Sequence, residues 1–177
     1  MTPCFSGGSL KVKIHISNLS EGVHQYDFHE EPSELGLDER FGRQVVVKAE
    51  LEKRRNQFFL RVKLETVGRF ICDRCADEFD MSLNNEYRMA YVFSRKDAEG
   101  YDEDEITLIK ENTSLIDISD DVRQFVILSV PLKLLCKEEC AGLCSTCGAN
   151  LNYEECKCHK EALDPRWEKL KNMVNNN

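Results

Sequence analysis

Cysteine spacing is the feature that most restricts how this 177-residue chain can fold. The pairs Cys72/Cys75 and Cys144/Cys147 each form a Cys-x-x-Cys unit, whose tight turn presents two sulfurs to one metal ion. Gly148 directly follows Cys147 and permits the positive φ that such a turn commonly needs. The first ten residues lack the basic and apolar stretches of a secretory signal, so we expect a cytoplasmic protein whose nine thiols stay reduced. Bound metal is therefore expected in place of disulfides.

A tetrahedral zinc ion takes four protein ligands in a structural site, so each Cys-x-x-Cys pair needs two partners. Cys156 and Cys158 follow the second pair closely enough for a short loop to return them to it. Cys136 and Cys140 would then join the first pair and clip the C-terminal part of the chain onto the sheet. We thus expect two Zn²⁺ ions held by eight ligands: Cys72, Cys75, Cys136, Cys140, Cys144, Cys147, Cys156 and Cys158.

Other divisions of the same cysteines stay open. One is a local site made by four successive cysteines: Cys136, Cys140, Cys144 and Cys147. This division would leave the first Cys-x-x-Cys pair to bind an ion together with Cys156 and Cys158. His159 could also replace Cys158 as a ligand. The chain could, finally, hold a single ion or none. Iron is less favoured than zinc, because a rubredoxin-like site would pair two Cys-x-x-Cys units. Cys4 is expected to be a free thiol.

Alternating polar and apolar residues predict β-strands in the first two thirds of the chain. The expected strands cover residues 10–16, 23–28, 44–51, 58–64, 79–83, 87–93, 106–109 and 115–118. The polar stretch 52–56 predicts a hairpin with a charged tip, and the Cys72 to Cys75 motif should join two strands.

One helix is expected after Ile118 and another near the C-terminus. The Ser119 hydroxyl should cap the first helix, and the two acidic residues after it suit the positive end of the helix dipole. Apolar residues at helical spacing should pack that helix on the sheet: Val122, Phe125 and Val126. Pro131 should end it, and Asp164-Pro165 should begin a short terminal helix.

These patterns predict an α+β fold, with a mainly antiparallel β-sheet, a packed helix and a C-terminal cysteine-rich zinc-binding module. We expect residues 1–135 to form a β-rich domain carrying the first Cys-x-x-Cys unit. Residues 136–177 should form a zinc-binding module with the short terminal helix. Hydrophobic residues make up 41% of the chain, and no apolar run reaches the ~18–20 residues of a membrane span.

The formal net charge of −8 would become −12 if eight thiols ionised to hold two Zn²⁺ ions. Such a chain has no general attraction for nucleic acid, so RNA contact would need a local basic patch. Candidate RNA-binding residues are Lys53, Arg54, Arg55 and Arg61, with Lys157, Lys160, Lys169 and Lys171 near the C-terminus. The acidic segment 97–105 is either a solvated loop or a surface for a basic protein partner, with Asp102, Glu103, Asp104 and Glu105 as its centre.

Catalysis is not expected. Four sulfurs per ion leave no coordination position for water or substrate. His15, His24 and His29 lie in expected strands or turns without a catalytic motif around them. A redox-active Cys72 would normally stand at the N-terminus of a helix, where the thiol pKa is lowered, but here the motif is expected to join two strands. We expect neither enzymatic activity nor a small-molecule substrate.

Several of these motifs together resemble the YceD family of bacterial proteins. The resemblance is carried by Cys72-Asp-Arg-Cys75 after a strand, by Pro131 before the later cysteines, by the string from Cys136 to Asn152, and by Asp164-Pro-Arg166. Within that string, Gly-Leu-Cys-x-x-Cys-Gly-x-Asn-Leu-Asn is specific to the family. Some members keep only the first motif and a later cysteine, which implies that the two metal sites are separable.

The resemblance implies a role in the accumulation of large-subunit ribosomal RNA, and hence in ribosome assembly, in bacteria and plastids. The family's gene commonly adjoins that of a small basic ribosomal protein. One hypothesis is a non-enzymatic factor that contacts rRNA, a ribosomal precursor particle or a ribosomal protein. The alternative is a chaperone-like binder of a basic ribosomal protein through residues 97–105. An RNA-processing enzyme is a minor alternative.

Overall fold

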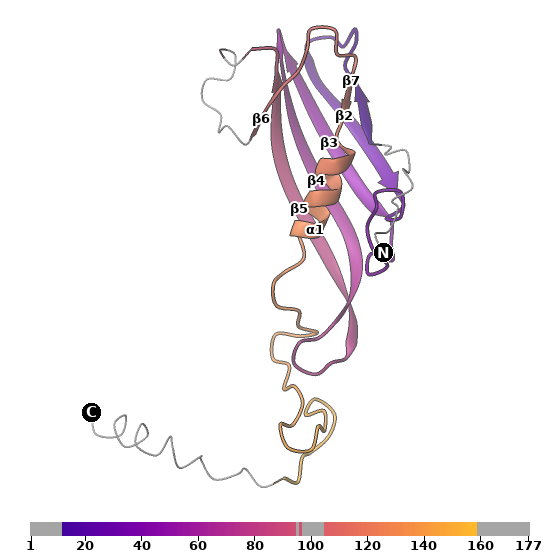
Figure 1. Cartoon of the computed structure of the whole chain (residues 1–177), viewed down its shortest axis with the longest axis vertical. Helices are drawn as coiled ribbons and strands as arrows, with labels where there is room; N and C mark the ends of the chain where they lie inside the picture. Colours follow the sequence, from indigo (N-terminus) through magenta and orange to yellow (C-terminus); the bar gives the residue numbers. More distant parts are fainter. Residues whose placement is uncertain (1–11, 95, 97–104, 159–177) are drawn as a thin grey trace, which may run out of the picture.

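The described residues form a five-stranded β-sheet, a two-stranded β-sheet and one α-helix (Figure 1). The computed structural model describes residues 12–94, 96 and 105–158. The larger sheet has the order β2-β3-β4-β5-β6, and the smaller one pairs β1 with β7. The elements are β1 (Lys13–His15), β2 (Gly22–Glu30), β3 (Val45–Arg54), β4 (Gln57–Ile71), β5 (Glu78–Val92), β6 (Ile106–Leu108), β7 (Leu115–Asp117) and α1 (Ser119–Leu128).

Strand pairing is antiparallel throughout both sheets except between β5 and β6, which are parallel. Arg55 and Asn56 form the turn between β3 and β4, and Arg55 adopts a positive φ of 45°. The predicted hairpin with a charged tip is therefore present. The predicted α+β fold with a mainly antiparallel sheet and a packed helix is confirmed.

Strands β4 and β5 are 15 residues each and extend beyond the rest of the sheet. Their pairing runs from Gln57↔Val92 to Ile71↔Glu78, whereas β3 accompanies β4 only as far as Glu65. The β4–β5 residues beyond this point therefore form a two-stranded ribbon, visible at the lower end of the sheet in Figure 1. The Cys72 to Cys75 turn stands at the tip of this ribbon.

One face of the large sheet is covered by α1 and by the β1–β7 pair. Buried residues from all of these elements form one core, which includes Val12, Leu51, Leu60, Ile118 and Val122. The Phe125 ring of α1 stacks on Tyr87 of β5, with ring centroids 4.3 Å apart and planes 6° from parallel. The Asn85 side chain donates a hydrogen bond of 2.8 Å to the carbonyl of Phe125, which fixes the helix along β5.

The predicted capping of α1 by Ser119 is wrong. Ser119 is the first residue of the helix, is fully buried, and its hydroxyl accepts a hydrogen bond of 3.1 Å from the backbone N–H of Val12. Asp117 instead places a carboxylate oxygen 3.1 Å from the backbone nitrogen of Ser119. Ser119 lies one residue after the N-cap position, which Ile118 occupies, and its hydroxyl satisfies a buried backbone donor next to β1.

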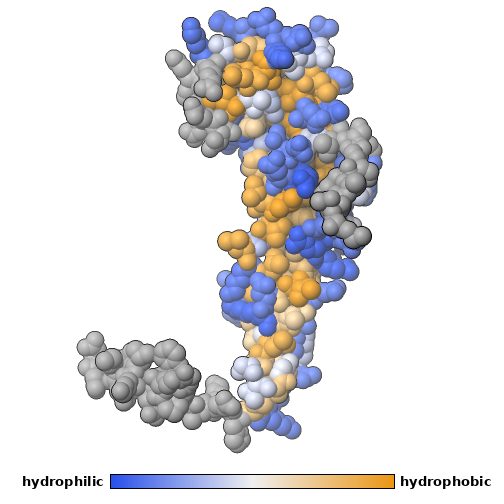
Figure 2. All heavy atoms as spheres, viewed as in Figure 1, coloured by the Kyte–Doolittle hydropathy of each residue, from blue (hydrophilic) through white to orange (hydrophobic). Residues whose placement is uncertain are grey.

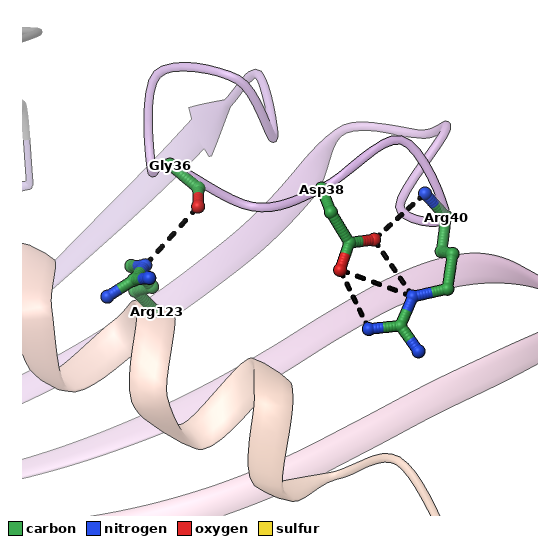
Figure 3. Close-up of polar contacts among 4 residues, drawn as sticks. All are labelled: Gly36, Asp38, Arg40 and Arg123. Carbon is green, nitrogen blue, oxygen red and sulfur yellow. Dashed lines mark hydrogen bonds and ion pairs between the residues drawn. The ribbon is translucent and has the colours of Figure 1, made fainter. Parts of the chain in front are cut away.

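The loop between β2 and β3 is fixed by polar contacts (Figure 3). The guanidinium of Arg123, on α1, donates a hydrogen bond of 3.3 Å to the carbonyl of Gly36. Asp38 accepts bonds from both the backbone and the side chain of Arg40, and this partner lowers the pKa of the carboxyl below its usual range. The loop is thus tied both to itself and to the helix.

After α1 the chain runs along β4 and β5 to the ribbon tip, where residues 130–158 form a compact cysteine-rich segment (Figure 1). Hydrophobic residues gather along the face that carries α1 in Figure 2, and Ile127, Leu128 and Leu132 are exposed there. Among the described residues, no helix has the length and apolar character required to cross a membrane. The predicted terminal helix from Asp164 lies outside the described residues.

Candidate metal centre

Four sulfurs meet at the tip of the β4–β5 ribbon, and we call this set the ribbon site. Cys72 and Cys75 come from the turn after β4, and Cys136 and Cys140 from the segment after α1. The Sγ atoms of Cys72 and Cys140 are 3.8 Å apart, and those of Cys75 and Cys136 are 3.7 Å apart. All but Cys136 are buried, so the ribbon site joins two distant parts of the chain within a small core of its own.

The other four clustered cysteines form a local set, which we call the loop site. Cys144, Cys147, Cys156 and Cys158 bring their sulfurs within 4.8 Å of one another. The Sγ of Cys156 lies 3.2 Å from that of Cys144 and 3.6 Å from that of Cys147. Cys147 is exposed and the other three are half-buried. The two sets are those that the sequence favoured; the alternative divisions would require sulfurs from different sets to meet.

The two Cys-x-x-Cys units have the same backbone structure. In the ribbon site, the N–H of Ala76 bonds to the carbonyl of Cys72, and the N–H of Cys72 bonds to that of Asp77. In the loop site, Gly148 bonds in the same way to Cys144, and Cys144 to Ala149. Ala76 and Gly148 both have positive φ, 59° and 76°. Each unit is therefore the same turn, closed by a residue in the left-handed region.

Sulfur spacing agrees with a tetrahedral ion in each set. A zinc ion with four ligands at ~2.3 Å separates neighbouring sulfurs by roughly 3.8 Å. Two sulfur pairs in each set lie between 3.2 and 3.8 Å apart, and every pair within a set lies within 4.8 Å. Four thiols converging in this way have the donor type and the number that a closed structural metal site requires. The two clusters can therefore hold metal ions.

Backbone N–H groups favour ionisation of the first cysteine in each Cys-x-x-Cys unit. Burial opposes ionisation of Cys72, but N–H groups that include those of Cys136 and Cys75 outweigh it and lower the pKa of the thiol to about 6. The N–H groups of Cys147 and Thr146 lower the pKa of Cys144 to about 6 as well. Since metal ligands are thiolates, each turn prepares one ligand for binding.

Residues between and beside the cysteines hold the two chain segments together. The N–H of Asp73 bonds to the carbonyl of Leu134, and the Asp73 carboxylate accepts the N–H of Leu134 at 2.7 Å. The Arg74 guanidinium donates to the carbonyls of Glu138 and Cys140, at 3.2 and 3.0 Å. The turn of the ribbon thus contacts both sides of the loop that carries Cys136 and Cys140.

Two asparagines link the loop site to the ribbon site. Asn152 donates from its amide to the Sγ of Cys140 at 3.3 Å, and this bond is the main cause that lowers the pKa of Cys140. The Asn152 amide oxygen also accepts the N–H of Ala141. Asn150 donates to the Asp77 carboxylate at 3.0 Å. The sequence alone predicted no role for Asn150 or Asn152, although both lie in the Cys136 to Asn152 string that carries the family resemblance.

The candidate RNA-binding residues do not form one basic patch. Arg54 pairs with Glu52 at 2.6 Å and lies over the Phe59 ring, and Arg61 pairs with Glu86 at 3.4 Å. Lys53 donates to the carbonyl of Leu19 and lies over Phe58, on the opposite face of the sheet. Arg55 is exposed at the hairpin tip. Lys157 is exposed beside the loop site.

Several other candidates lie outside the described residues: Cys4, Asp102, Glu103, Asp104, His159, Lys160, Lys169 and Lys171. Glu105 is described and half-buried, in a hollow on the open face of the sheet that is also lined by Arg54, Arg61 and Arg88. Of the acidic segment 97–105, Glu105 is therefore the one residue that the structure describes.

Comparison with known proteins points to one family. The family model for the large ribosomal RNA subunit accumulation protein YceD matches residues 60–174, a stretch that contains all eight clustered cysteines. The chain is 26% identical over 158 residues to a chloroplastic YCED homolog 1 of Arabidopsis thaliana, covering 75% of this chain and 49% of that protein. A Zea mays protein of the same name is 28% identical over 141 residues, covering 64% of this chain and 48% of its own length.

An uncharacterized protein of Mycobacterium tuberculosis is 38% identical over 117 residues, covering 64% of this chain and 53% of its own length. The chain thus spans about half the length of these curated relatives. No solved structure matches it. Because the family model matches well over half of the chain, we conclude that this protein belongs to the YceD family of large ribosomal RNA subunit accumulation proteins.

Proposed function

We propose that this protein is a non-enzymatic factor needed for the accumulation of large-subunit ribosomal RNA, and that two structural zinc ions stabilise its fold. The names of the family model and of the plant relatives support the role in ribosomal RNA accumulation. The proposal places the protein in the cytoplasm, because the thiolates that hold zinc must stay reduced. Its partners would be large-subunit rRNA, a precursor particle or a ribosomal protein.

The observation that carries the zinc proposal is the convergence of eight thiols into two sets of four. We assign one ion to each set, with all eight cysteines as ligands. An ion with four sulfur ligands has no position for water or substrate, which supports a structural role and a protein without catalytic activity. The ion of the ribbon site would join two units along the chain, a β-rich domain of residues 1–135 and a zinc-binding module of residues 136–177, and the ion of the loop site would stabilise the second unit from within.

Zinc stoichiometry in paired cysteine variants tests this assignment. The purified protein should hold two equivalents of zinc, and Cys72→Ser/Cys75→Ser or Cys144→Ser/Cys147→Ser should each hold one. The first variant should release the segment after α1 from the ribbon tip, and the second should unfold residues 144–158 alone. A Cys72→Ser/Cys140→Ser variant should also hold one ion, because both cysteines belong to the ribbon site. Retention of two ions by any of these variants, or loss of both ions from Cys72→Ser/Cys140→Ser, would show that the ligands are divided differently.

Complementation in cells tests the function separately from the metal. In cells that lack the native gene, the unaltered chain should restore large-subunit rRNA to its usual ratio against small-subunit rRNA. The Cys72→Ser/Cys75→Ser variant should fail to do so at equal protein abundance. A chain that binds two zinc ions but does not restore the rRNA ratio would retain the metal proposal and remove the functional one.

Contact with a basic protein is the second candidate function. The basic side chains Arg54 and Arg61 are engaged by carboxylates of the same sheet, which weakens the case for a direct RNA contact there. Neutralising Asp102, Glu103, Asp104 and Glu105 should reduce capture of a basic ribosomal protein if segment 97–105 is its binding surface. Reversal of Arg54, Arg55 and Arg61 should reduce RNA binding in a low-salt filter assay if the hairpin is the RNA surface.

A further inference from the structure

Within the described part of the chain, strand β2 forms an open edge of the large sheet. It is nine residues long and is paired with β3 on one side (Figure 1). Among the described residues, no backbone hydrogen bond joins residues 22–29 to any segment other than β3. A strand edge of this length presents a row of unpaired N–H and C=O groups, which is a template for an added strand.

The outward-facing groups of β2 follow from the register. A two-residue turn makes Arg54 and Gln57 a hydrogen-bonded pair, so every second residue of β3 counted from Arg54 bonds to β4 and the others bond to β2. The bond from the N–H of Arg69 to the carbonyl of Arg40 agrees with this alternation. On β2, the residues that direct N–H and C=O to the open edge are therefore Val23, Gln25, Asp27 and His29.

The chain around this edge is acidic. Residues 14–39 contain no lysine or arginine and seven acidic side chains, of which Asp38 is paired with Arg40: Glu21, Asp27, Glu30, Glu31, Glu34, Asp38 and Glu39. The cations of the neighbouring strand are engaged elsewhere, since Lys48 pairs with Glu65 at 3.2 Å and Lys53 bonds to the carbonyl of Leu19. An occupant of the edge therefore meets an excess of negative charge.

Proteins usually protect a long edge strand with proline, lysine or a bulge. The nine residues of β2 include no proline or lysine, and their register with β3 is continuous from Gly22 to Glu30. The loop that follows β2 is held by Arg123 and by the Asp38–Arg40 pair (Figure 3). Strand β2 itself therefore carries no proline, lysine or bulge that would oppose pairing with a further strand.

We infer that the open edge of β2 binds an extended, lysine- or arginine-rich polypeptide segment of another protein as an additional antiparallel or parallel strand. Backbone hydrogen bonds would supply the pairing, and the acidic residues near the edge would select a basic segment. A second copy of this chain is a poor occupant because it would bring the same seven carboxylates against these. The inference depends on β2 alone and stands or falls independently of zinc binding and of rRNA accumulation.

Binding of designed peptides to the full, metal-loaded chain tests the inference. The first probe is a fluorescent peptide of about ten residues that alternates lysine with threonine, which suits a strand. The second replaces threonine by proline, which keeps the charge and removes strand pairing. The third replaces lysine by glutamate. We expect the first peptide to bind about tenfold more tightly than the second, and the third not to bind. Equal binding of both lysine peptides would overturn the inference.

Variants of the chain locate the binding surface. Gln25→Pro removes one outward N–H at a position where an edge strand tolerates proline, and it should weaken the lysine–threonine peptide about tenfold. Gln25→Ala, which keeps that N–H, is its control. Asp27→Lys/Glu31→Lys should also weaken binding about tenfold, whereas Glu154→Lys/Glu155→Lys, with the same change in net charge at the other end of the molecule, should not.

Hydrogen exchange gives a readout that does not depend on whether a variant folds. In the unaltered chain, the peptide should slow exchange at the amides of Val23, Gln25, Asp27 and His29. Protection elsewhere, or none at all, would place the peptide at another surface and overturn the inference. Self-association through β2, seen as a concentration-dependent dimer that Gln25→Pro abolishes, would replace the basic partner by a second copy.

Discussion

At the scale of single residues, the two Cys-x-x-Cys turns differ in the residue that closes them. Ala76 and Gly148 both adopt the left-handed region, where a side chain costs free energy and glycine does not. Gly148 allowed the positive φ after Cys147 to be predicted from sequence, whereas the alanine at position 76 gave no indication of a positive φ. The two turns share their hydrogen bonds although the residue type at this position differs, so the turn accepts either residue.

Replacing Gly148 by Ala should therefore weaken the loop site through backbone strain alone, because a Cβ at this position meets no atom within 4 Å. We expect about 1 kcal/mol of lost stability for the loop-site segment. Ala76→Gly should be neutral or slightly stabilising for the ribbon site. Metal-competition titrations with a coloured chelator would measure both effects, and an equal loss in the two variants would contradict this explanation.

Asn152 is a further residue-scale test, because its amide bonds to a sulfur of the site to which it does not belong. Asn152→Ala should lower the zinc affinity of the ribbon site by roughly 10- to 100-fold, as the loss of an outer hydrogen bond to a metal ligand commonly does. The loop site should keep its affinity. Asn112→Ala, at an exposed position, serves as the control. Unchanged affinity of the ribbon site would show that the amide is dispensable.

At the scale of elements, the sequence predicted most strands and the helix but divided the longest strands. It expected strands at 58–64, 79–83 and 87–93, where the structure has β4 and β5 at full length. The alternation of apolar residues is interrupted on the inner face by Thr66 and Gly68 of β4 and by Asn85 of β5. Asn85 faces inward because α1 offers it the carbonyl of Phe125. The sequence around Asn85 does not indicate that this carbonyl will be its partner, because the contact forms only in the tertiary structure.

Gly68 lies where the Phe70 ring crosses the backbone, and a Cβ there would meet ring atoms at 2.5 Å. Gly68→Ala should displace Phe70 from its edge-to-face contact with Phe41 and cost roughly 1–3 kcal/mol of stability. Denaturant unfolding would measure the loss. Val67→Ala, on the opposite face of the same strand, should cost less; the reverse order would contradict the proposed clash.

The start of α1 provides a pH-dependent test. Burial opposes ionisation of Asp117, but bonds from Ser119 and the nearby Lys13 outweigh it and lower the pKa of the carboxyl. A lowered pKa contributes stability above the ordinary value near 4, and this contribution is lost as pH falls through the folded value. Asp117→Asn should cost about 0.5–1 kcal/mol at pH 7, since the side chain is 41% exposed, and the difference from the unaltered chain should shrink below pH 4. Unfolding curves at several pH values would show whether the difference behaves in this way.

At the scale of the whole molecule, the main core and the ribbon site are separate hydrophobic clusters. Sequence spacing indicated that Cys136 and Cys140 return to the first pair, because Cys156 and Cys158 lie close enough in the chain to complete the set of the second pair. It could not indicate that Asn150 and Asn152 would bridge the sites, because that depends on how segments distant in the chain are oriented. The opposite faces of Lys53 and Arg54 follow from the alternation of side chains along a strand; the sequence missed them because it assigned both residues to the hairpin tip, whereas β3 continues to Arg54.

Removal of zinc should therefore affect the two ends of the molecule differently. After chelation, we expect the sheet and α1 to remain folded and the segment 130–158 to detach from the ribbon. Amides of the main core, such as those of Leu60 and Val62, should keep their protection from hydrogen exchange. The amides of Asp73 and Leu134, which bond across the two segments, should lose theirs. Uniform loss of protection would mean that the metals support the entire fold.

The positions of the ligands along the chain make the two sites depend differently on the rest of the fold. The sulfurs that approach in the ribbon site are 61 and 68 residues apart, whereas those of the loop site are 9 and 12 apart. Closing the longer span costs roughly 1.5 kcal/mol more for a flexible chain, unless the sheet has already brought its ends together. The loop site can close within its own segment, whereas the ribbon site needs β4, β5 and α1 in place. An ion held in the ribbon site would therefore report that the sheet and the helix have folded.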